Sequence, residues 1–359
     1  MKILLGSYAD FNALLGVEQS LKALGHEVVT FDTRDYMAVC SYFAKKKAKL
    51  GFSGRAQYEN KIAQKIIRTA AEFCPQLILF INGPEKVLTP TEFSKLQLVA
   101  KKIGAAIAVY FVDPVEKDIV SWAGRCGHAG IEEYYPYFDN VFVYEKTDVK
   151  YLSAGGVHPT YIPLGFNELY SRAIPAKAQD IDIIFVGNAH NPRLKILTEL
   201  ARIAKKRDWN LKIVGPMYDT RYCWKKWQFK KKYPEIFQFL EATQKSPTEV
   251  AELYTRAKIA LNIHKTGALS LNPRSFEIMA AGGFELTDAR GDYAGLTVAK
   301  MLAVFKDTTE LIDKIEYYLA HTAERQQIAA CGRDFVRAHY SMRQTMAKII
   351  KTVTEDKNE

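Results

Sequence analysis

The sequence predicts an α/β protein that contains two domains, each built on a doubly wound parallel sheet. Its 359 residues exceed what a single core usually supports, and 48% of them are hydrophobic. In both halves, short apolar runs rich in β-branched residues alternate with helical patterns that begin at a capping residue or end at glycine. This alternation is typical of parallel sheets with helices on both faces.

Residues 1–166 are expected to form the first domain. Its predicted strands are 3–7, 27–31, 77–81, 105–112, 140–144 and 159–166, and its predicted helices are 17–24, 57–73, 91–103 and 147–154. Residues 167–181, which contain Pro175, read as a linker.

Three first-domain residues are candidates for binding or catalysis. Gly16 ends the expected loop 7–16, where it permits a close backbone approach beside a helix N-terminus, although an ordinary turn fits equally well. Asp113 follows a buried strand, where site residues gather, and it suits either an acceptor-side or catalytic role or a turn before proline. His128, in the glycine-rich stretch 122–130, is a candidate general base or hydrogen-bond donor, or a surface histidine. No complete G-x-G-x-x-G occurs, which disfavours a dinucleotide-dependent dehydrogenase.

The second domain is expected at residues 182–340, followed by a last helix and tail at 341–359. Its predicted strands are 182–186, 211–214, 236–240, 259–263, 284–287 and 302–305, and its predicted helices are 248–256, 273–281, 309–320, 324–339 and 342–353. The first strand runs into Gly187, Asn188 and Arg193, an order that suits phosphate binding at a helix N-terminus. Arg193 can grip a phosphate with two hydrogen bonds, or it is an exposed arginine on a first turn.

The stretch around helix 273–281 carries the strongest site prediction. Asn272 is a typical N-cap, followed by proline at the first helical position, and Gly282 is expected to end the helix. A helix N-terminus flanked by Lys265 and Arg274 is an anion site. Glu277 can accept hydrogen bonds from a ribose or sugar diol, or it pairs with Arg274 three residues earlier. The residues expected to contact the ligand here are His264, Lys265, Asn272, Arg274 and Glu277.

Residues 271–284 (LNPRSFEIMAAGGF) resemble the donor-nucleotide motif of GT-B glycosyltransferases of the group 1 (family 4) type, and they are most similar to the CgeB-like spore-maturation branch. The resemblance implies two Rossmann-like domains facing across a cleft, with the last helix crossing back to the first domain. It also implies that Glu277 holds the ribose of a nucleotide sugar and that Arg193 grips the pyrophosphate.

The sequence departs from the family pattern at two positions. Leu269 stands where many members carry a second Glu that contacts the sugar, and Asn188 stands at the first basic position of the phosphate grip. Lys265 is expected to replace the missing charge and to act in catalysis. The resemblance further implies retention of configuration. The sequence shows no D-x-D at the carboxyl end of a predicted strand, which agrees with catalysis independent of metal and without a cofactor.

The composition of the chain indicates the cellular compartment of the protein and the kind of partner that it binds. The formal net charge of +10 favours an acidic partner, although solubility alone explains it equally well. The five cysteines are scattered with no C-x-x-C, which fits a reducing compartment and argues against a zinc site. No apolar run approaches the roughly 20 residues of a membrane span. We therefore expect a cytoplasmic protein.

The stretch from Tyr218 to Tyr233 interleaves aromatic and basic residues (YDTRYCWKKWQFKKKY). Such a pattern suits peripheral contact with an anionic membrane surface or stacking on nucleic acid. A helix that packs its aromatic residues inward and keeps its lysines outward is the favoured interpretation.

Taken together, these features predict a glycosyltransferase of hexosyltransferase type that uses a nucleotide sugar. The acceptor stays open among an anionic polymer, a lipid-linked glycan, a protein and nucleic acid. Two alternatives remain. One is a nucleotide-binding maturation protein without turnover, which the departures at Leu269 and Asn188 suggest. The other is a nucleic-acid modifier or binder.

Overall fold

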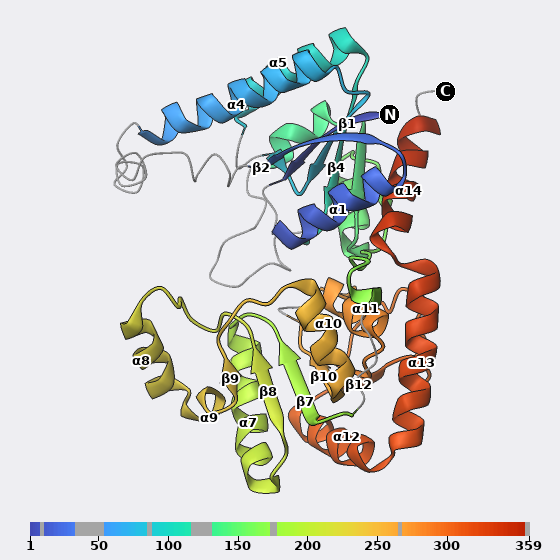
Figure 1. The fold of residues 1–359 in the computed structure, drawn as a ribbon. Coiled ribbons are helices and arrows are strands. Elements are labelled where there is room, and N and C mark those ends of the chain that lie inside the picture. Colours follow the sequence, from blue (N-terminus) through green and yellow to red (C-terminus); the bar gives the residue numbers. More distant parts are fainter. Residues whose placement is uncertain are drawn as a thin grey trace. The chain divides into compact units, whose positions relative to one another are not determined.

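The computed structural model describes residues 1–7, 11–32, 54–84, 88–115, 131–172, 178–264 and 268–355. The chain divides into two compact units, one comprising Met1–Pro163 with Met342–Glu359 and the other Leu164–Ser341. Each unit holds one six-stranded sheet in which every strand pair is parallel (Figure 1). The predicted fold class of two parallel α/β sheets is confirmed.

The first unit orders its strands β2-β1-β3-β4-β5-β6. Its elements are β1 (Lys2–Ser7), α1 (Phe11–Ala23), β2 (Glu27–Asp32), α4 (Gly54–Phe73), β3 (Leu77–Ile81), α5 (Pro90–Ile103), β4 (Ala106–Phe111), the short 3₁₀ helix η2 (Ile131–Tyr137), β5 (Asn140–Val143), α6 (Lys146–Ala154) and β6 (Pro159–Tyr161). The last helix of the chain, α14 (Met342–Glu355), packs against α1 and so belongs to this unit.

The second unit orders its strands β12-β11-β10-β7-β8-β9. Its elements are η3 (Tyr170–Arg172), β7 (Ile181–Val186), α7 (Asn191–Arg207), β8 (Leu211–Val214), α8 (Cys223–Lys232), α9 (Pro234–Phe237), β9 (Leu240–Glu241), α10 (Pro247–Arg256), β10 (Ala257–Asn262), α11 (Pro273–Ala281), β11 (Glu285–Asp288), β12 (Ala303–Phe305), α12 (Thr308–Ala320) and α13 (Thr322–His339).

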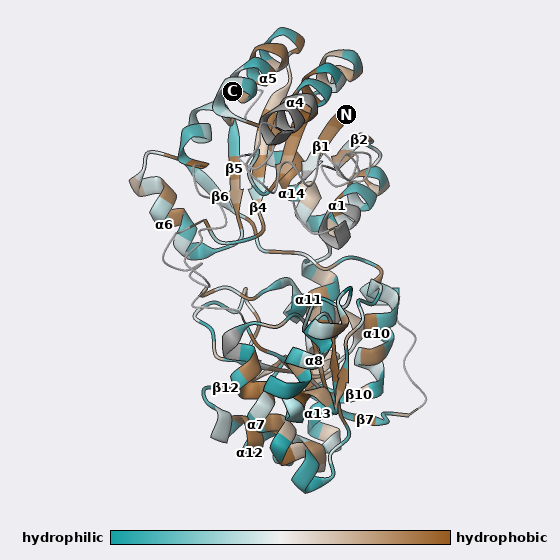
Figure 2. Ribbon diagram, turned by 90° about the vertical axis from the view of Figure 1, so that its left-hand side faces the viewer, coloured by the Kyte–Doolittle hydropathy of each residue, from teal (hydrophilic) through white to brown (hydrophobic). Residues whose placement is uncertain are grey.

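The strands form the core of each unit, as expected for sheets covered on both faces. All residues of β3 and β4 are buried, and β7 and β10 are buried except for one residue each. Figure 2 shows these central strands in brown, with polar residues on the outer helical faces. Among the described residues, no helix is long and apolar enough to cross a membrane.

Three predicted elements are wrong in detail. The strand expected at 159–166 ends at Tyr161. The loop expected at 7–16 is helical from Phe11, so Gly16 lies inside α1 rather than at a turn. A glycine inside a helix costs only about 1 kcal/mol, and the buried Val17 and Leu21 anchor the helix to the core. The strand expected at 236–240 is helix α9 followed by the two-residue strand β9. Proline at the first position of α9 favours a helix start, and so short an apolar run does not distinguish strand from helix.

Candidate functional site

Helix α11 begins at the carboxyl edge of the second sheet, where ligands bind in folds of this type. The Asn272 side chain caps the helix by accepting a hydrogen bond from the Ser275 backbone N–H, and proline occupies the first position. Gly282 ends the helix in the left-handed conformation, with φ 88°. These caps, each predicted from the sequence, hold the positive end of the helix dipole at the strand ends.

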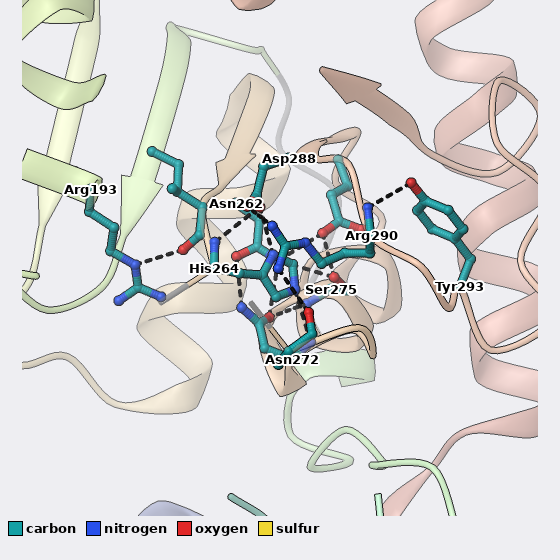
Figure 3. Close-up of polar contacts among 11 residues, drawn as sticks. Arg193, Asn262, His264, Asn272, Ser275, Asp288, Arg290 and Tyr293 are labelled. Carbon is teal, nitrogen blue, oxygen red and sulfur yellow. Dashed lines mark hydrogen bonds and ion pairs between the residues drawn. The ribbon is translucent and has the colours of Figure 1, made fainter. Parts of the chain in front are cut away.

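A buried amide network fixes the start of α11 to two strands. Asn262, the last residue of β10, places its side-chain Nδ2 3.0 Å from Asn272 Oδ1, 3.0 Å from Ser275 Oγ and 2.9 Å from Glu285 Oε1 (Figure 3). Ser275 Oγ also donates to Glu285 Oε1 over 2.6 Å. Because Glu285 begins β11, the network ties α11, β10 and β11 into one rigid corner.

Glu285 is an unusual member of this network. Its side chain is 1% exposed, and its second oxygen, Oε2, is buried without a hydrogen-bond partner. Burial raises the pKa of Glu285 to about 7, while the hydrogen bonds from Ser275 and Asn262 act in the opposite direction. The corner therefore contains a carboxyl group that exchanges its proton near neutral pH.

A second set of polar contacts positions His264. Its ring Nδ1 lies 2.7 Å from Asp288 Oδ1, and its Nε2 accepts a hydrogen bond from the Asn272 backbone N–H over 3.1 Å. Because Asp288 can only accept at Nδ1 and the Asn272 N–H donates to Nε2, these contacts indicate a neutral ring that carries its proton on Nδ1. Burial lowers the pKa of His264, although the neighbouring Asp288 opposes this effect. Asp288 is held in turn by Arg290, which also donates to the Ala268 carbonyl (Figure 3).

Arg193 lies in the first turn of α7, at the carboxyl end of the neighbouring strand β7. Its Nε donates to the Ile263 carbonyl over 2.6 Å and its Nη1 to the Asn188 carbonyl over 3.4 Å. Its side chain is 8% exposed, and it has no acidic hydrogen-bond or ion-pair partner among the described residues. Burial and the nearby Arg274 lower the pKa of Arg193 to about 10, so the guanidinium stays charged at neutral pH.

Two glycines allow the backbone ends of β7 and β8 to meet beside Arg193. Gly215 has φ +132°, and a Cβ atom at this position would lie 2.2 Å from the Gly187 carbonyl oxygen. A Cβ on Gly187 would itself lie 3.0 Å from the Phe185 ring and 3.5 Å from Arg193 Nη1. The site therefore needs glycine at position 215 and leaves little space for a side chain at position 187; the sequence predicted Gly187 and missed Gly215.

Glu277 lies one turn further into α11 and is engaged by its neighbours. Arg274 Nη1 is 3.1 Å from Glu277 Oε2 and also donates to the Tyr254 hydroxyl over 3.2 Å. Burial raises the pKa of Tyr170, and Glu277, to which its hydroxyl is hydrogen-bonded, adds to the shift. The Arg274–Glu277 pair considered from the sequence is thus present, and the Glu277 side chain stays 18% exposed.

The structure brings together most of the second-unit residues singled out from the sequence. Arg193, His264, Asn272 and Arg274 share one edge of the sheet, since Arg193 contacts the residue before His264 and interacts electrostatically with Arg274. Asn188 contributes only its backbone carbonyl, because its side chain is exposed. Lys265 and His128 lie outside the described residues.

In the first unit, Asp113 follows β4 and is exposed. Asn82, at the end of the adjacent strand β3, donates from Nδ2 to Asp113 Oδ2 over 3.3 Å and accepts from the Val112 backbone N–H over 2.9 Å. Burial raises the pKa of Tyr144, and Asp113 with two buried acids, Glu145 and Asp148, adds to that rise. Asp113 is thus held at a strand end, as the sequence predicts, within an acidic group of which the sequence identified only one member.

The polar residues that the sequence analysis missed in the second unit are Asn262, Glu285, Asp288 and Arg290. Asn262 and Asp288 end the parallel strands β10 and β11, and this position was a usable signal. Glu285 was hidden, because a glutamate at the start of an apolar strand reads as an exposed edge residue. Within the described ranges, no group of three or more acidic, histidine or cysteine side chains is placed to hold a metal ion.

Comparisons with known proteins agree with this architecture. Residues 193–351 match a family model described as glycosyl transferase-like. No curated protein matches the chain by sequence. Among solved structures, sucrose-phosphate synthase from Thermosynechococcus elongatus is 14% identical with a TM-score of 0.69, and the alignment covers 99% of each chain.

Two further structures share the fold over the whole chain. A glycosyltransferase from Rickettsia africae is 14% identical with a TM-score of 0.67, covering 99% of this chain and 98% of that one. Anabaena HepE in complex with UDP-glucose is 12% identical with a TM-score of 0.67, covering 99% of this chain and 100% of that one. At these identities the likeness shows the fold alone, and the family match adds the type of protein. The chain has the GT-B fold, and its residues 193–351 carry a glycosyl transferase-like domain.

Proposed function

We propose that the chain transfers a sugar from a nucleoside diphosphate sugar, bound by the unit Leu164–Ser341, to an acceptor. The observation that carries the proposal is Arg193, a buried guanidinium whose hydrogen-bond partners in the described structure are backbone carbonyls. Asp288 acts on Arg193 only from a distance, and a buried cation without a directly bonded anion is costly, so a diphosphate supplies the contact that is missing.

The surroundings of Arg193 suit the same ligand. Strands β7 and β10 are parallel neighbours, so α7 and α11, which follow them, both start at this edge of the sheet. Two helix N-termini add partial positive charge, which favours a bound phosphate. In this proposal the diphosphate lies between Arg193 and the start of α11, with Lys265 as a further cation.

Glu277 is proposed to hold the ribose. In this proposal the nucleoside follows the diphosphate along α11 and reaches Glu277 one turn beyond the helix start. Arg274 fixes one carboxylate oxygen, so a diol would meet a carboxylate of set orientation. The solved complex of HepE with UDP-glucose makes UDP-sugars the first donors to test.

The chemistry asked of these residues is stabilisation of the leaving diphosphate. Charge that develops on the leaving oxygen is neutralised by Arg193 and by the positive end of the α11 dipole, both of which are in place before reaction. Retention of configuration and independence from a metal ion are part of the proposal, and they rest on the family resemblance.

The experiment compares Arg193→Met with wild type in binding UDP and uridine, measured by calorimetry. A charge-assisted phosphate contact is worth about 1.5–3 kcal/mol, so UDP should bind about 10- to 100-fold more weakly while uridine is unaffected. Arg202→Met, on an exposed face of α7 and paired with Glu235, is the matched control and should leave UDP affinity unchanged.

Arg193 also bonds to the Ile263 carbonyl, so the fold of each variant must be checked by circular dichroism. Arg193→Lys keeps the charge but loses the forked geometry, and it should fall between Arg193→Met and wild type. Equal losses for UDP and uridine in a folded variant would remove Arg193 from the diphosphate.

A second candidate is a nucleotide-binding protein without turnover. It is favoured by Leu269, which is 42% exposed where many related enzymes carry a glutamate that contacts the sugar. An assay of UDP release from a bound UDP-sugar, run with and without acceptor, separates the two candidates. An enzyme should release UDP at least slowly. Donor binding with no UDP release under either condition would favour the second candidate.

A further inference from the structure

Helix α8 lies at the β9 edge of the second sheet (Figure 1), and aromatic side chains on this helix and just before it are exposed to solvent. Trp224 is 49% exposed, Trp227 is 63% exposed and Tyr222, just before the helix, is 47% exposed. The described residues include seven large hydrophobic side chains that are exposed, and three of the seven lie between residues 222 and 227. The favoured sequence interpretation, in which the aromatic residues pack inward, is therefore wrong for both tryptophans.

The inward face of α8 is already occupied. Phe229 is 7% exposed and packs against Tyr218 and Tyr233, with ring centroids 5.5 and 5.1 Å away. At 100° per residue, Trp224 and Trp227 fall on the side of the helix opposite Phe229, with Lys231 between them. Attachment of α8 to the domain thus needs Phe229 and leaves the tryptophans without a structural task.

The charge of the helix has a single sign. Residues 223–232 contain five lysines and no acidic residue. The two acids that flank the helix are paired elsewhere, Asp219 with Arg221 and Glu235 with Arg202. Lysines in the last turn stabilise the helix C-terminus through its dipole. That effect accounts for Lys230 to Lys232, but not for the lysines earlier in α8 or for the exposed tryptophans.

The lysines and tryptophans lie against each other. Lys225 Nζ is 4.3 Å from the Trp224 ring centre, and Lys231 Nζ is 5.3 Å from the Trp227 ring centre, both within cation–π range. One face of each indole is therefore covered by an ammonium group, which leaves less ring surface for a stacked base. The surface is also one side of a single helix, whereas single-stranded nucleic acids bind in grooves that follow their backbone.

We propose that the face of α8 formed by Trp224, Trp227 and Lys231, flanked by the other lysines of the helix, docks on the surface of an anionic lipid bilayer. Tryptophan rings favour the depth of the lipid headgroups, and lysines extend to anionic phosphates above them. The α8 face and the bilayer surface also have opposite charges, and a basic segment is attracted to an anionic leaflet. This inference does not depend on the proposed reaction.

The test is cosedimentation of the full chain with vesicles of phosphatidylcholine alone and of phosphatidylcholine mixed with phosphatidylglycerol. Wild type should bind the mixed vesicles, more weakly as salt rises, and should not bind the neutral ones. Trp224→Ala with Trp227→Ala should lower the affinity for mixed vesicles by about tenfold or more. Lys230→Gln with Lys231→Gln should lower it by a similar factor.

Matched controls separate this face from general charge and aromatic content. Lys205→Gln with Lys206→Gln removes the same charge from the exposed end of α7, and Tyr317→Ala removes another exposed aromatic ring. Both controls should bind mixed vesicles like wild type. Addition of mixed vesicles should shift tryptophan emission to shorter wavelength in wild type but not in Trp224→Phe with Trp227→Phe.

Two results would overturn the proposal. One is equal vesicle binding by wild type and by the folded α8 variants. The other is binding of single-stranded DNA that is tighter than vesicle binding and is lost with Trp224 and Trp227, which would assign this face to nucleic acid.

Discussion

Replacing Glu285 by glutamine should remove a pH dependence of stability that the buried carboxyl imposes on the second unit. Burial raises the pKa of Glu285 from 4.5 to about 7 in the folded protein. Between these values the folded chain holds a proton that the unfolded chain has released, so the free energy of unfolding falls as the pH rises. The group's stabilising contribution is complete below pH 4.5 and is lost as the pH passes the folded pKa.

The size of the effect follows from the shift. A difference of about 2.5 pKa units, at about 1.36 kcal/mol per unit, amounts to about 3 kcal/mol. Glutamine preserves the shape and the oxygen that accepts from Asn262 and Ser275, but it carries no titrating proton. The stability of wild type relative to Glu285→Gln should therefore fall by about 3 kcal/mol between about pH 4.5 and pH 8.

The assay is urea unfolding at a series of pH values, followed by tryptophan fluorescence, to which Trp209 contributes from a position packed against the core of the second unit. The difference between the two proteins matters, because His264 and the other titrating groups are common to both. Glu252→Gln, at an exposed position on α10, is the control and should show a constant difference from wild type. A constant difference for Glu285→Gln as well would refute the reasoning.

Three other predictions concern the same corner of the molecule. Gly215→Ala should destabilise the protein by about 2 kcal/mol or more in urea unfolding, since its Cβ would meet the Gly187 carbonyl at 2.2 Å; a neutral result would show that the two strand ends can separate. Nitrogen NMR should find the His264 ring neutral, protonated on Nδ1, and still neutral as the pH falls below 6.5, whereas an Nε2–H signal would contradict the assigned contacts. Glu277→Gln should bind UDP about tenfold or more weakly but bind 2′,3′-dideoxy-UDP like wild type; unchanged UDP affinity would leave Glu277 only its pairing with Arg274.

Local signals in the sequence were enough to predict the helix boundaries at the site. The N-cap Asn272, the proline that follows it and the terminating Gly282 act within a few residues of each other, so sequence order alone reveals them. The alternation of apolar runs and helices likewise predicted both parallel sheets. The local signals gave the wrong start for α1, because Gly16 was interpreted as a break before the helix. The burial of one helix face outweighs the helix-destabilising effect of this glycine.

The interior of the corner was not predictable, because it depends on strand register. Ala260 pairs with Glu285, which brings Asn262 and Glu285 together from positions 23 residues apart. No pattern in a single sequence records that register. The outward tryptophans of α8 were missed for a different reason, since on so short a helix the aromatic spacing does not show which face is buried.

The most direct test of a donor site in the second unit is a crystal structure of the chain with a bound nucleoside diphosphate, chosen by thermal shift among UDP, GDP, ADP and TDP and their sugars. The proposed site predicts phosphate oxygens within hydrogen-bond distance of Arg193 and of a backbone N–H at the start of α11, with the ribose hydroxyls at Glu277. A diphosphate bound away from Arg193 and α11, or no rise in melting temperature with any of these ligands, would contradict it.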